Sequence, residues 1–496
     1  MSDLRTPEAA APPRLPYSYA RRAGVLLRPA GAGVECLHRA DAPLDALLEA
    51  QRVAPGAAFV AVADPAFDAA LQAGYGNSAS TAADIEIAET DLAALADSAA
   101  GGVDDLLDAR DDSPVIRLIN ALLLEAIKEG ASDVHVETQE RRLVVRFRID
   151  GRLRDIVEPP RALAPLLVSR IKVMAKLDIA ERRTPQDGRV TLRIGGHDVD
   201  ARVSTMPTQH GERVVLRILE RGGVQLDLAA LGMSERDTGV FQRLLERPHG
   251  MLLVTGPTGS GKTTTLYSAL NRLNDRRRNV MTVEDPIEYE LAGIAQTQVN
   301  PRTDMTFARG LRAILRQDPD VIMVGEIRDQ ETAQVAVRSS MTGHFVLSTL
   351  HTNSAIGSVT RLIDMGVERY LLAPMVVGLV AQRLVRRLCP HCRWQDRATP
   401  ADSALLGYAI KPGKKLWRPG ECEHCHGEGY RGRAGVYEVV AVDDALQALI
   451  HNGASEAELQ AAARVANPSL LDDGVEKIRA GVTTVEEVAR VVRDEA

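Results

Sequence analysis

The run Gly256-Pro-Thr-Gly-Ser-Gly-Lys-Thr263 constrains the fold of this chain more than any other feature of its sequence. It matches the pattern G-x-x-x-x-G-K-[ST] at every fixed position. The apolar run Met251–Val254 precedes it and a helical pattern follows, which is the strand–loop–helix context that the motif requires. Backbone N–H groups of such a loop, together with the positive end of the helix, bind phosphate oxygens. The motif therefore predicts a nucleoside triphosphate site on an α/β sheet.

The residue types in this loop predict which groups contact the nucleotide. Lys262 is expected to reach the β- and γ-phosphates, and the Thr263 hydroxyl is expected to bind Mg²⁺. Either ATP or GTP fits these contacts. The expected nucleotide-binding set consists of Gly256, Pro257, Thr258, Gly259, Ser260, Gly261, Lys262, Thr263 and Thr264.

Two further apolar runs end in side chains that suit phosphoryl transfer. Glu326 follows Val321–Val324, and we expect this strand to lie beside the strand of the loop, so that Glu326 faces Mg²⁺ and the γ-phosphate. Aspartate is usual at this position, so the longer glutamate predicts contact through a metal-bound water. His351 ends the run Phe345–Leu350, where open α/β sheets place ligands, and we predict that it senses the γ-phosphate.

An acidic cluster follows another apolar run, Val280–Val283. Glu284, Asp285 and Glu288 lie directly after it, and one of them can orient or deprotonate an attacking water. A solvated acidic turn explains the same residues equally well.

Arg309, Arg312 and Arg316 have the spacing i, i+3, i+7, which predicts one face of a helix. Arginines on a solvated helix face are common, so the spacing alone indicates little. Because phosphoryl transfer needs cations near the developing charge, the three are candidates for that role.

Four of the five cysteines form two C-x-x-C pairs, Cys389 with Cys392 and Cys422 with Cys425, and 29 residues separate the pairs. Four thiolates in this pattern fit a tetrahedral Zn²⁺ site, and a site filled by four protein ligands is structural. The intervening loop is longer than is usual for such sites. Cys36 is alone and is expected to be a small buried residue.

The pattern of apolar residues divides the chain into several segments. Residues 1–98 resemble a small α/β domain, with strands near 24–27 and 58–62 and helices near 44–52 and 65–73. Residues 99–113 are small and acidic and predict a linker. Residues 114–230 predict an α+β domain with hairpins at Asp150-Gly151 and Gly195-Gly196. Residues 231–496 alternate strands and helices, which predicts a mostly parallel sheet covered on both faces and carrying the cysteine subdomain at 389–425.

Composition excludes some classes of function. The net charge is −7 and aromatic residues make up 3% of the chain, which is a poor composition for nucleic-acid binding. No stretch approaches the roughly 18 apolar residues of a spanning helix. Because Met1–Pro16 also lacks a signal-peptide pattern, we expect a protein that is cytosolic or works at a membrane through a partner.

Taken together, these motifs resemble the secretion-ATPase superfamily, which powers type II secretion, type IV pili and related machines. The resemblance covers about residue 112 to the end, is strongest to the type II secretion ATPases, and is carried by GPTGSGKT, VEDPIEY, GEIRDQETA, TGHFVLSTLHTN, GASDVHVE, RFRIDG, RRTPQDGR and the cysteine pairs. It implies a RecA-like ATPase domain, a preceding α+β (PAS-like) domain, ATP with Mg²⁺ and Zn²⁺, and a homohexameric ring.

The resemblance also implies roles for individual residues. Glu288 matches the position that activates water, Glu326 matches the Walker B glutamate, and His344 and His351 match a histidine box. Arg202 and Arg217 match arginines of the α+β domain that reach the nucleotide, and Arg312 and Arg316 match a further pair. Residues 1–98 look like the domain that docks on inner-membrane platform proteins, chiefly the cytoplasmic domain of the type II secretion L protein. The expected location is the cytoplasmic face of the inner membrane.

Other functions are compatible with parts of this pattern. A type IV pilus assembly ATPase shares the cysteine pairs, but the short region before the core favours type II secretion. A DNA-uptake motor is disfavoured by the net charge of −7. A nucleotide-gated scaffold without turnover is disfavoured by the complete set of acidic residues.

Overall fold

The computed structural model describes residues 23–30, 33–63, 114–194, 197–220 and 231–492, together with positions 15, 20, 66–67, 70 and 92. Contacts divide the chain into two units. The first comprises residues 1–149 and 153–221, and the second comprises residues 150–152 and 222–496. The expected linker at 99–113 and the turn at Gly195-Gly196 lie outside the described residues, as does most of the helix expected at 65–73.

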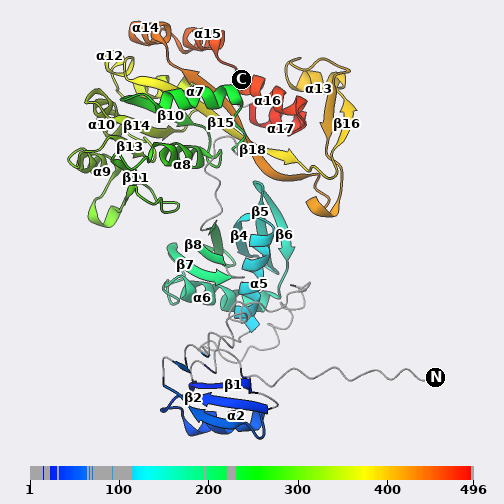
Figure 1. The fold of residues 1–496 in the computed structure, drawn as a ribbon. Helices are drawn as coiled ribbons and strands as arrows, with labels where there is room; N and C mark the ends of the chain where they lie inside the picture. The colour runs from blue at the N-terminus through cyan, green and yellow to red at the C-terminus, as the bar shows by residue number, and fades with distance from the viewer. Residues whose placement is uncertain are drawn as a thin grey trace. The chain divides into compact units, whose positions relative to one another are not determined.

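The amino-terminal part of the first unit contains a three-stranded sheet of order β1-β2-β3 and one helix (Figure 1). Its elements are β1 (Val25–Ala30), β2 (Gly33–His38), α2 (Leu44–Val53) and β3 (Ala58–Ala61). The strand expected near 58–62 forms, but the expectation that it is buried is wrong. β3 is the edge strand beside β2, and all four of its residues are exposed.

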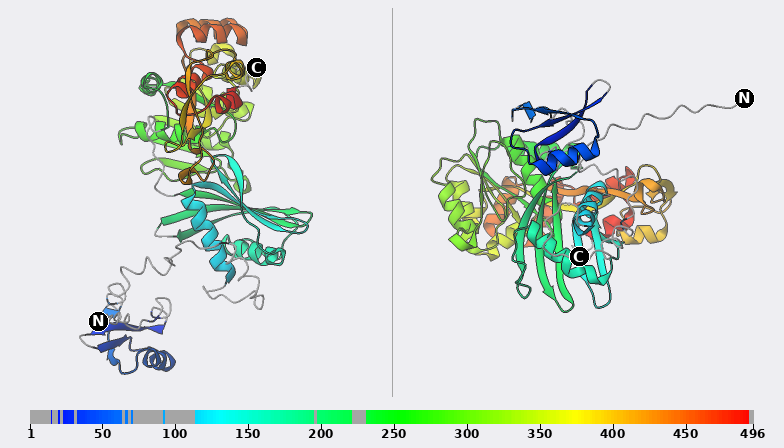
Figure 2. Two further views of the ribbon diagram at one scale, coloured as in Figure 1. Left: turned by 90° about the vertical axis from the view of Figure 1, so that its right-hand side faces the viewer. Right: turned by 90° about the horizontal axis from the view of Figure 1, so that it is seen from below.

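Residues 114–220 form a six-stranded sheet of order β6-β5-β4-β9-β8-β7, and its neighbouring strands pair antiparallel wherever their register is given. Helices α5 and α6 bury their apolar side chains against one face of this sheet (Figure 2). Because alternate residues of a strand face opposite sides, the other face carries the polar side chains. The elements are α5 (Pro114–Lys128), β4 (Ala131–Thr138), β5 (Leu143–Ile149), β6 (Arg152–Val157), α6 (Ala164–Met174), β7 (Gln186–Ile194), β8 (His197–Thr208) and β9 (Gly211–Glu220).

The second unit contains a seven-stranded sheet of order β12-β11-β13-β14-β10-β15-β18. All of its neighbours pair in parallel except β15 and β18, so the predicted parallel sheet is confirmed. The strands are β10 (Gly250–Thr255), β11 (Val280–Glu284), β12 (Ala295–Gln298), β13 (Val321–Val324), β14 (Phe345–Leu350), β15 (Val376–Leu388) and β18 (Tyr430–Ala441).

Helices cover both faces of this sheet. On one face, α7 (Glu235–Leu245) and α8 (Lys262–Leu273) bury Phe241 and Leu270 against alternate residues of the central strands. On the other face, α9, α10, α11, α16 and α17 enclose a larger core. The remaining helices of the unit are α9 (Phe307–Ile314), α10 (Gln330–Met341), α11 (Gly357–Asp364), α12 (Arg369–Leu372), α13 (Pro400–Leu405), α14 (Asp444–Asn452), α15 (Glu456–Ala466), α16 (Leu470–Arg479) and α17 (Val485–Val492).

The sheet order corrects the expectation that the Glu326 strand lies beside the strand of the phosphate loop. Strand β14 lies between β13 and β10 and pairs with both. Because all three strands are parallel, their carboxyl ends still meet at one edge of the sheet, and residues that follow them lie at that edge.

No helix among the described residues combines the length and the apolar character needed to cross a bilayer. The longest of the helices named above, α5, has 15 residues.

Candidate nucleotide site and metal centre

The phosphate loop connects β10 to α8 at the carboxyl edge of the sheet. Gly256 has φ 148° and Gly261 has φ 88°. A Cβ atom at Gly256 would lie 2.4 Å from the Gln382 carbonyl oxygen, and one at Gly261 would lie 2.8 Å from Gln382 Nε2. Only glycine fits both the left-handed backbone and this close approach, so β15 behind the loop fixes its curvature.

Lys262 begins α8, and its side chain folds over the loop. Its Nζ donates to the carbonyl oxygens of Gly256 at 2.7 Å and Pro257 at 3.0 Å. Burial lowers the pKa of Lys262 to about 8; Glu326 acts to raise it and Arg383 to lower it. The ammonium is therefore a weakly solvated cation at the position where phosphate charge is expected.

The loop fits a triphosphate by its donors and its shape. Ser260 is buried, and its Oγ has no hydrogen-bond partner among the described residues, which is unusual for a buried hydroxyl. A phosphate oxygen would satisfy it. Thr263 is exposed at the first turn of α8, where its hydroxyl is accessible to a cation held by the phosphates.

Glu326 and His351 lie together at the same edge. His351 Nε2 is 3.5 Å from a carboxylate oxygen of Glu326, and Arg328 forms an ion pair with the same carboxylate. Burial and then Lys262 lower the pKa of His351, while Glu326 acts in the opposite direction. His351 is therefore neutral at physiological pH. The structure thus brings Lys262, Glu326 and His351 within electrostatic reach of one another, as the sequence predicts.

The acidic cluster separates into residues with different surroundings. Glu284 is buried at the end of β11, and both of its oxygens are occupied. Tyr267 donates to Oε2, whereas Thr282 at 2.6 Å and Gln296 at 3.0 Å donate to Oε1. Asp285 is exposed, and its charge acts on Arg328. Glu288 is half-buried, and its backbone N–H donates to the Tyr267 hydroxyl at 3.3 Å.

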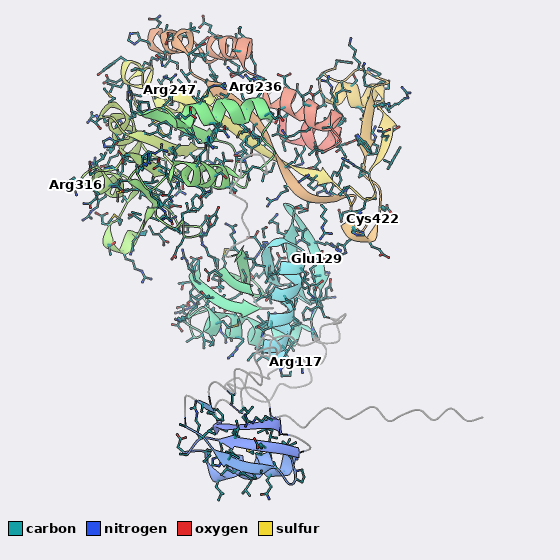
Figure 3. All side chains as sticks on the ribbon, viewed as in Figure 1. Arg117, Glu129, Arg236, Arg247, Arg316 and Cys422 are labelled. Carbon is teal, nitrogen blue, oxygen red and sulfur yellow. The ribbon has the colours of Figure 1, made fainter. Side chains whose placement is uncertain are left out.

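Several predicted site residues lie elsewhere. His344 precedes β14 and bonds to the Ser339 carbonyl, so it lies one strand length, about 17 Å, from the phosphate-loop edge. The helix expected to carry three arginines ends at Ile314, so Arg316 lies beyond it, exposed on this unit (Figure 3). Arg312 pairs with Glu331 at 2.5 Å. No contact in the described part of the chain joins Arg312 or Arg316 to the phosphate loop.

Arg202 and Arg217 are direct cross-strand partners on β8 and β9 of the first unit. Ala201 and Val203 are buried on the other face, as the sequence predicts. Arg217 Nε bonds to Asp133 Oδ1 at 2.9 Å, and the Arg217 side chain is 58% exposed. Burial acts to raise the pKa of Asp133, but hydrogen bonds from Ser132 and Arg217 lower it overall.

Sequence reasoning missed two residues of β15 behind the phosphate loop. Gln382 accepts a hydrogen bond from Thr265 of α8 at 2.8 Å and is buried. Arg383 is also buried and donates to the Asn353 carbonyl, two residues after His351, at 2.7 Å. The available signal was a polar pair inside the long apolar run Val376–Leu388. Buried polar residues in such a strand must be hydrogen-bonded.

The two cysteine pairs converge into one cluster. Its four sulfurs lie within 4.8 Å of one another. The Sγ–Sγ distances are 3.7 Å for Cys389–Cys422, 3.7 Å for Cys392–Cys425 and 3.6 Å for Cys422–Cys425. A tetrahedral Zn²⁺ with bonds of about 2.3 Å requires sulfurs about 3.8 Å apart, so the cluster fits this ion.

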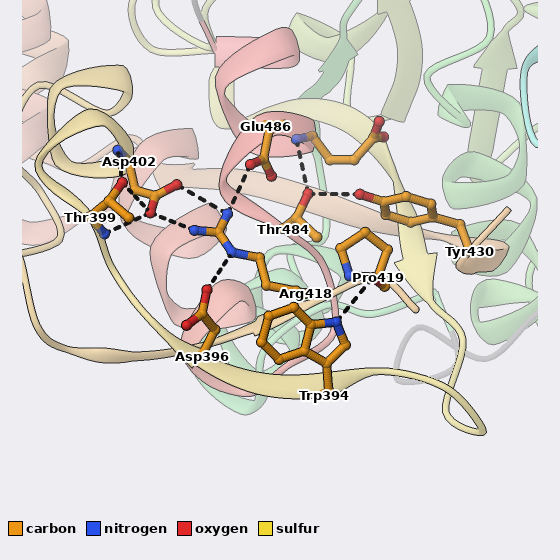
Figure 4. A network of polar contacts seen from close by, with 10 residues as sticks. Trp394, Asp396, Thr399, Asp402, Arg418, Pro419, Tyr430, Thr484 and Glu486 are labelled. Atoms are coloured by element: carbon orange, nitrogen blue, oxygen red, sulfur yellow. Dashed lines mark hydrogen bonds and ion pairs between the residues drawn. The ribbon is translucent and has the colours of Figure 1, made fainter. Parts of the chain in front are cut away.

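The segment between the pairs forms β16 (Trp394–Arg397), α13 and β17 (Lys415–Arg418), and Arg418 holds it together (Figure 4). Its guanidinium binds Asp402 at 2.6 Å, Glu486 of α17 at 3.0 Å and Asp396 at 3.1 Å. The metal subdomain is thus fixed to the carboxy-terminal helices by an ion-pair network as well as by the cysteines.

A P-loop on a parallel sheet, with a separate tetracysteine centre, defines a class: P-loop nucleotide-binding proteins with a structural metal subdomain. A profile of the type II/IV secretion system protein family matches residues 108–490, and one of the first amino-terminal domain of GSPII protein E matches residues 14–75. The chain belongs to the family of type II/IV secretion system proteins, which confirms the resemblance seen in the sequence.

Relatives align over nearly the whole chain. The type II secretion system protein E of Pseudomonas aeruginosa is 57% identical, over 100% of this chain and 99% of its own length. The type II secretion system ATPase E of Vibrio cholerae is 52% identical over 97% of both chains.

Two solved structures share the fold. The pilus retraction motor PilT with bound ADP has a TM-score of 0.52 and 25% identity, and covers 75% of this chain and 96% of its own. The ATPase DotB of Legionella pneumophila has a TM-score of 0.58 and 21% identity, and covers 77% of this chain and 96% of its own.

The lowered pKa of Lys262 predicts that nucleotide binding weakens at alkaline pH. The ammonium is lost as pH rises through about 8, and between pH 7.5 and 9 its charged fraction falls roughly tenfold. We expect the association constant for ATP, measured by calorimetry, to fall by about the same factor. Lys262→Ala lacks the titrating group and should show a much smaller change. Equal pH dependence in the two proteins would contradict this assignment.

The tetracysteine cluster predicts one Zn²⁺ per chain by elemental analysis. Cys392→Ser should lose the metal and unfold at a lower temperature, because one of four ligands is removed. Cys36→Ser is the matched control, since Cys36 is buried in a separate core and should leave the zinc content unchanged. Metal-free wild-type protein with the same unfolding temperature would refute the site.

Proposed function

We propose that this chain is the ATPase of a type II secretion system, which hydrolyses ATP to ADP and phosphate to drive pseudopilus assembly and protein export. One observation carries the proposal: the phosphate loop, Glu326 and His351 meet at one sheet edge in a chain 52% identical to a type II secretion system ATPase over 97% of its length. The test is phosphate release with ATP, using Lys262→Ala as the inactive control. Export in a deletion strain should be restored by the wild type and not by that variant.

The residues of the site have distinct proposed tasks in hydrolysis. Lys262 and the loop N–H groups bind the phosphates, and Thr263 with Glu326 holds Mg²⁺, Glu326 through water. Bound Mg²⁺ would neutralise phosphate charge. His351, neutral and 3.5 Å from Glu326, is placed to donate to the γ-phosphate.

Glu288 is the proposed general base. The competing residue, Glu284, already accepts three hydrogen bonds from protein donors, so its lone pairs are occupied by Tyr267, Thr282 and Gln296. Glu288 lies in the segment that follows it and is half-buried. Because a base must be accessible to water, the half-buried carboxylate suits the role better than the buried one.

Glu288→Gln should retain ATP binding and lose hydrolysis by about 10²–10⁴-fold, because the amide keeps the shape and removes the basicity. Glu284→Gln is the matched variant: it should act mainly on stability, because it disturbs a buried hydrogen-bond network. Phosphate release, ATP affinity and unfolding temperature distinguish the two. Normal hydrolysis by Glu288→Gln with loss in Glu284→Gln would reverse the roles.

We place the active form in a homohexamer, in which Arg202 and Arg217 deliver positive charge to a nucleotide. Arg217 is more than half exposed and is held by Asp133, so it is presented on the polar face of its sheet. Arg312 and Arg316 are a further proposed pair; being outside their own phosphate loop, they would serve the nucleotide of a neighbouring subunit.

Assembly should therefore control turnover. The hydrolysis rate per chain is expected to rise with protein concentration, and Arg217→Ala should remove most of that rise. An arginine finger contributes up to about 10³–10⁵ in turnover, largely in the transition state, so ATP affinity should change less than about tenfold. Arg142→Ala, an exposed arginine of the same sheet paired with Glu158, is the control. A high, constant rate down to monomer would contradict the model of assembly control.

The proposed docking partner of residues 1–98 is the cytoplasmic domain of the secretion system's L protein, which would hold the ATPase on the cytoplasmic face of the inner membrane. Large apolar side chains on this part are exposed, notably Leu44, Leu48 and Phe59. Exposed apolar surface of this kind supports a protein partner. A type IV pilus or DNA-uptake role is less favoured, because the relatives named above are type II secretion proteins.

A further inference from the structure

Tyr267 lies at the junction between the phosphate-loop helix and the acidic segment. It is fully buried on α8, five residues after Lys262. Its hydroxyl donates to Glu284 Oε2 and accepts the backbone N–H of Glu288 at 3.3 Å. One oxygen atom therefore bonds both to the end of β11 and to the residue proposed as the base.

The surrounding contacts fix this hydroxyl and the segment it holds. Gln296 of β12 donates to Glu284 at 3.0 Å and to the Tyr289 carbonyl at 3.3 Å, and its own oxygen accepts from the Leu291 N–H at 2.7 Å. Residues 284–291 are thus bonded at several points to α8 and β12. The Tyr267 and Tyr289 rings meet edge to face, with centroids 4.6 Å apart.

The hydroxyl is suited to act as a fixed donor. Burial, and then the Glu284 charge, raise the pKa of Tyr267 far above its ordinary value, so the proton stays on the phenol. A permanently protonated hydroxyl bonded to a carboxylate makes a strong hydrogen bond. Its lone pairs remain for the Glu288 N–H, which is the contact that locates the Glu288 backbone.

We propose that Tyr267 is a positioning residue for ATP hydrolysis: its hydroxyl ties the Glu288 segment to the helix that carries Lys262 and Thr263, so that the water-activating carboxylate is held at a fixed place relative to the bound phosphates. This proposal rests on the proposed ATPase function. Tyr267 itself does not reach the nucleotide. It acts through Glu288, because the same helix that binds phosphate at its first turn bonds Glu288 at its second.

The test is Tyr267→Phe, which keeps the ring and its packing and removes only the hydroxyl. We expect kcat for ATP to fall about 10- to 100-fold, since a misplaced catalytic group costs on that order, while KM and ATP affinity change less than about threefold. Tyr289→Phe is the matched control: its hydroxyl is buried in the same cluster and has no hydrogen-bond partner among the described residues, so kcat should not change.

A double-mutant comparison separates positioning from general stability. In the Glu288→Gln background, Tyr267→Phe should cause no further loss, because residues that act as a unit are non-additive. Additive losses, or a kcat equal to that of Tyr289→Phe, would overturn the proposal. If Tyr267→Phe does not fold, as judged by circular dichroism and thermal unfolding, Gln296→Met replaces it and the same kcat-specific, non-additive loss is expected. Absence of hydrolysis by the wild type would instead reject the proposed function.

Discussion

The phosphate loop is held from behind by strand β15, and the site depends on this contact. Gly256 and Gly261 approach Gln382 so closely that no Cβ fits, and Gln382 bonds to Thr265 of α8. The curve of the loop, the start of α8 and the direction of Lys262 follow from it. Arg383, the next residue, bonds to the loop after His351. One buried polar pair thus fixes both the phosphate-binding loop and the segment that carries a proposed γ-phosphate sensor.

Parallel pairing then gathers the charged groups. Strands β10, β14 and β13 run side by side, so Lys262, His351 and Glu326 emerge at one edge although they are far apart in the sequence. Burial lowers the pKa of Lys262, and Glu326 partly opposes this. A cation that is poorly solvated before phosphate arrives loses less hydration on binding it, which favours phosphate over water as its partner.

Much of the site could be predicted because its residues occur in contiguous motifs with fixed spacing. The phosphate loop is one such motif, and the cysteine pairs are another, since sulfur geometry tolerates a long insert between knuckles. Prediction failed where the answer depended on which strands are neighbours. The order β13-β14-β10, the exposed edge strand β3 and the end of α9 before Arg316 were not encoded in any local pattern. Local periodicity gives an element and its faces but does not say what packs against it.

The amino-acid sequence by itself determined the class of the ATP site, the family, the parallel sheet and the metal ligands, because these depend on residue types at short, fixed separations. The tertiary structure alone decided that Glu284 is consumed by Tyr267, Thr282 and Gln296, leaving Glu288 as the proposed base, and that Gln382 and Arg383 support the loop. These outcomes depend on hydrogen bonds between strands and helices far apart in the chain. Such bonds have no local signature, because a buried polar side chain becomes structural or reactive only through the partners that folding brings to it.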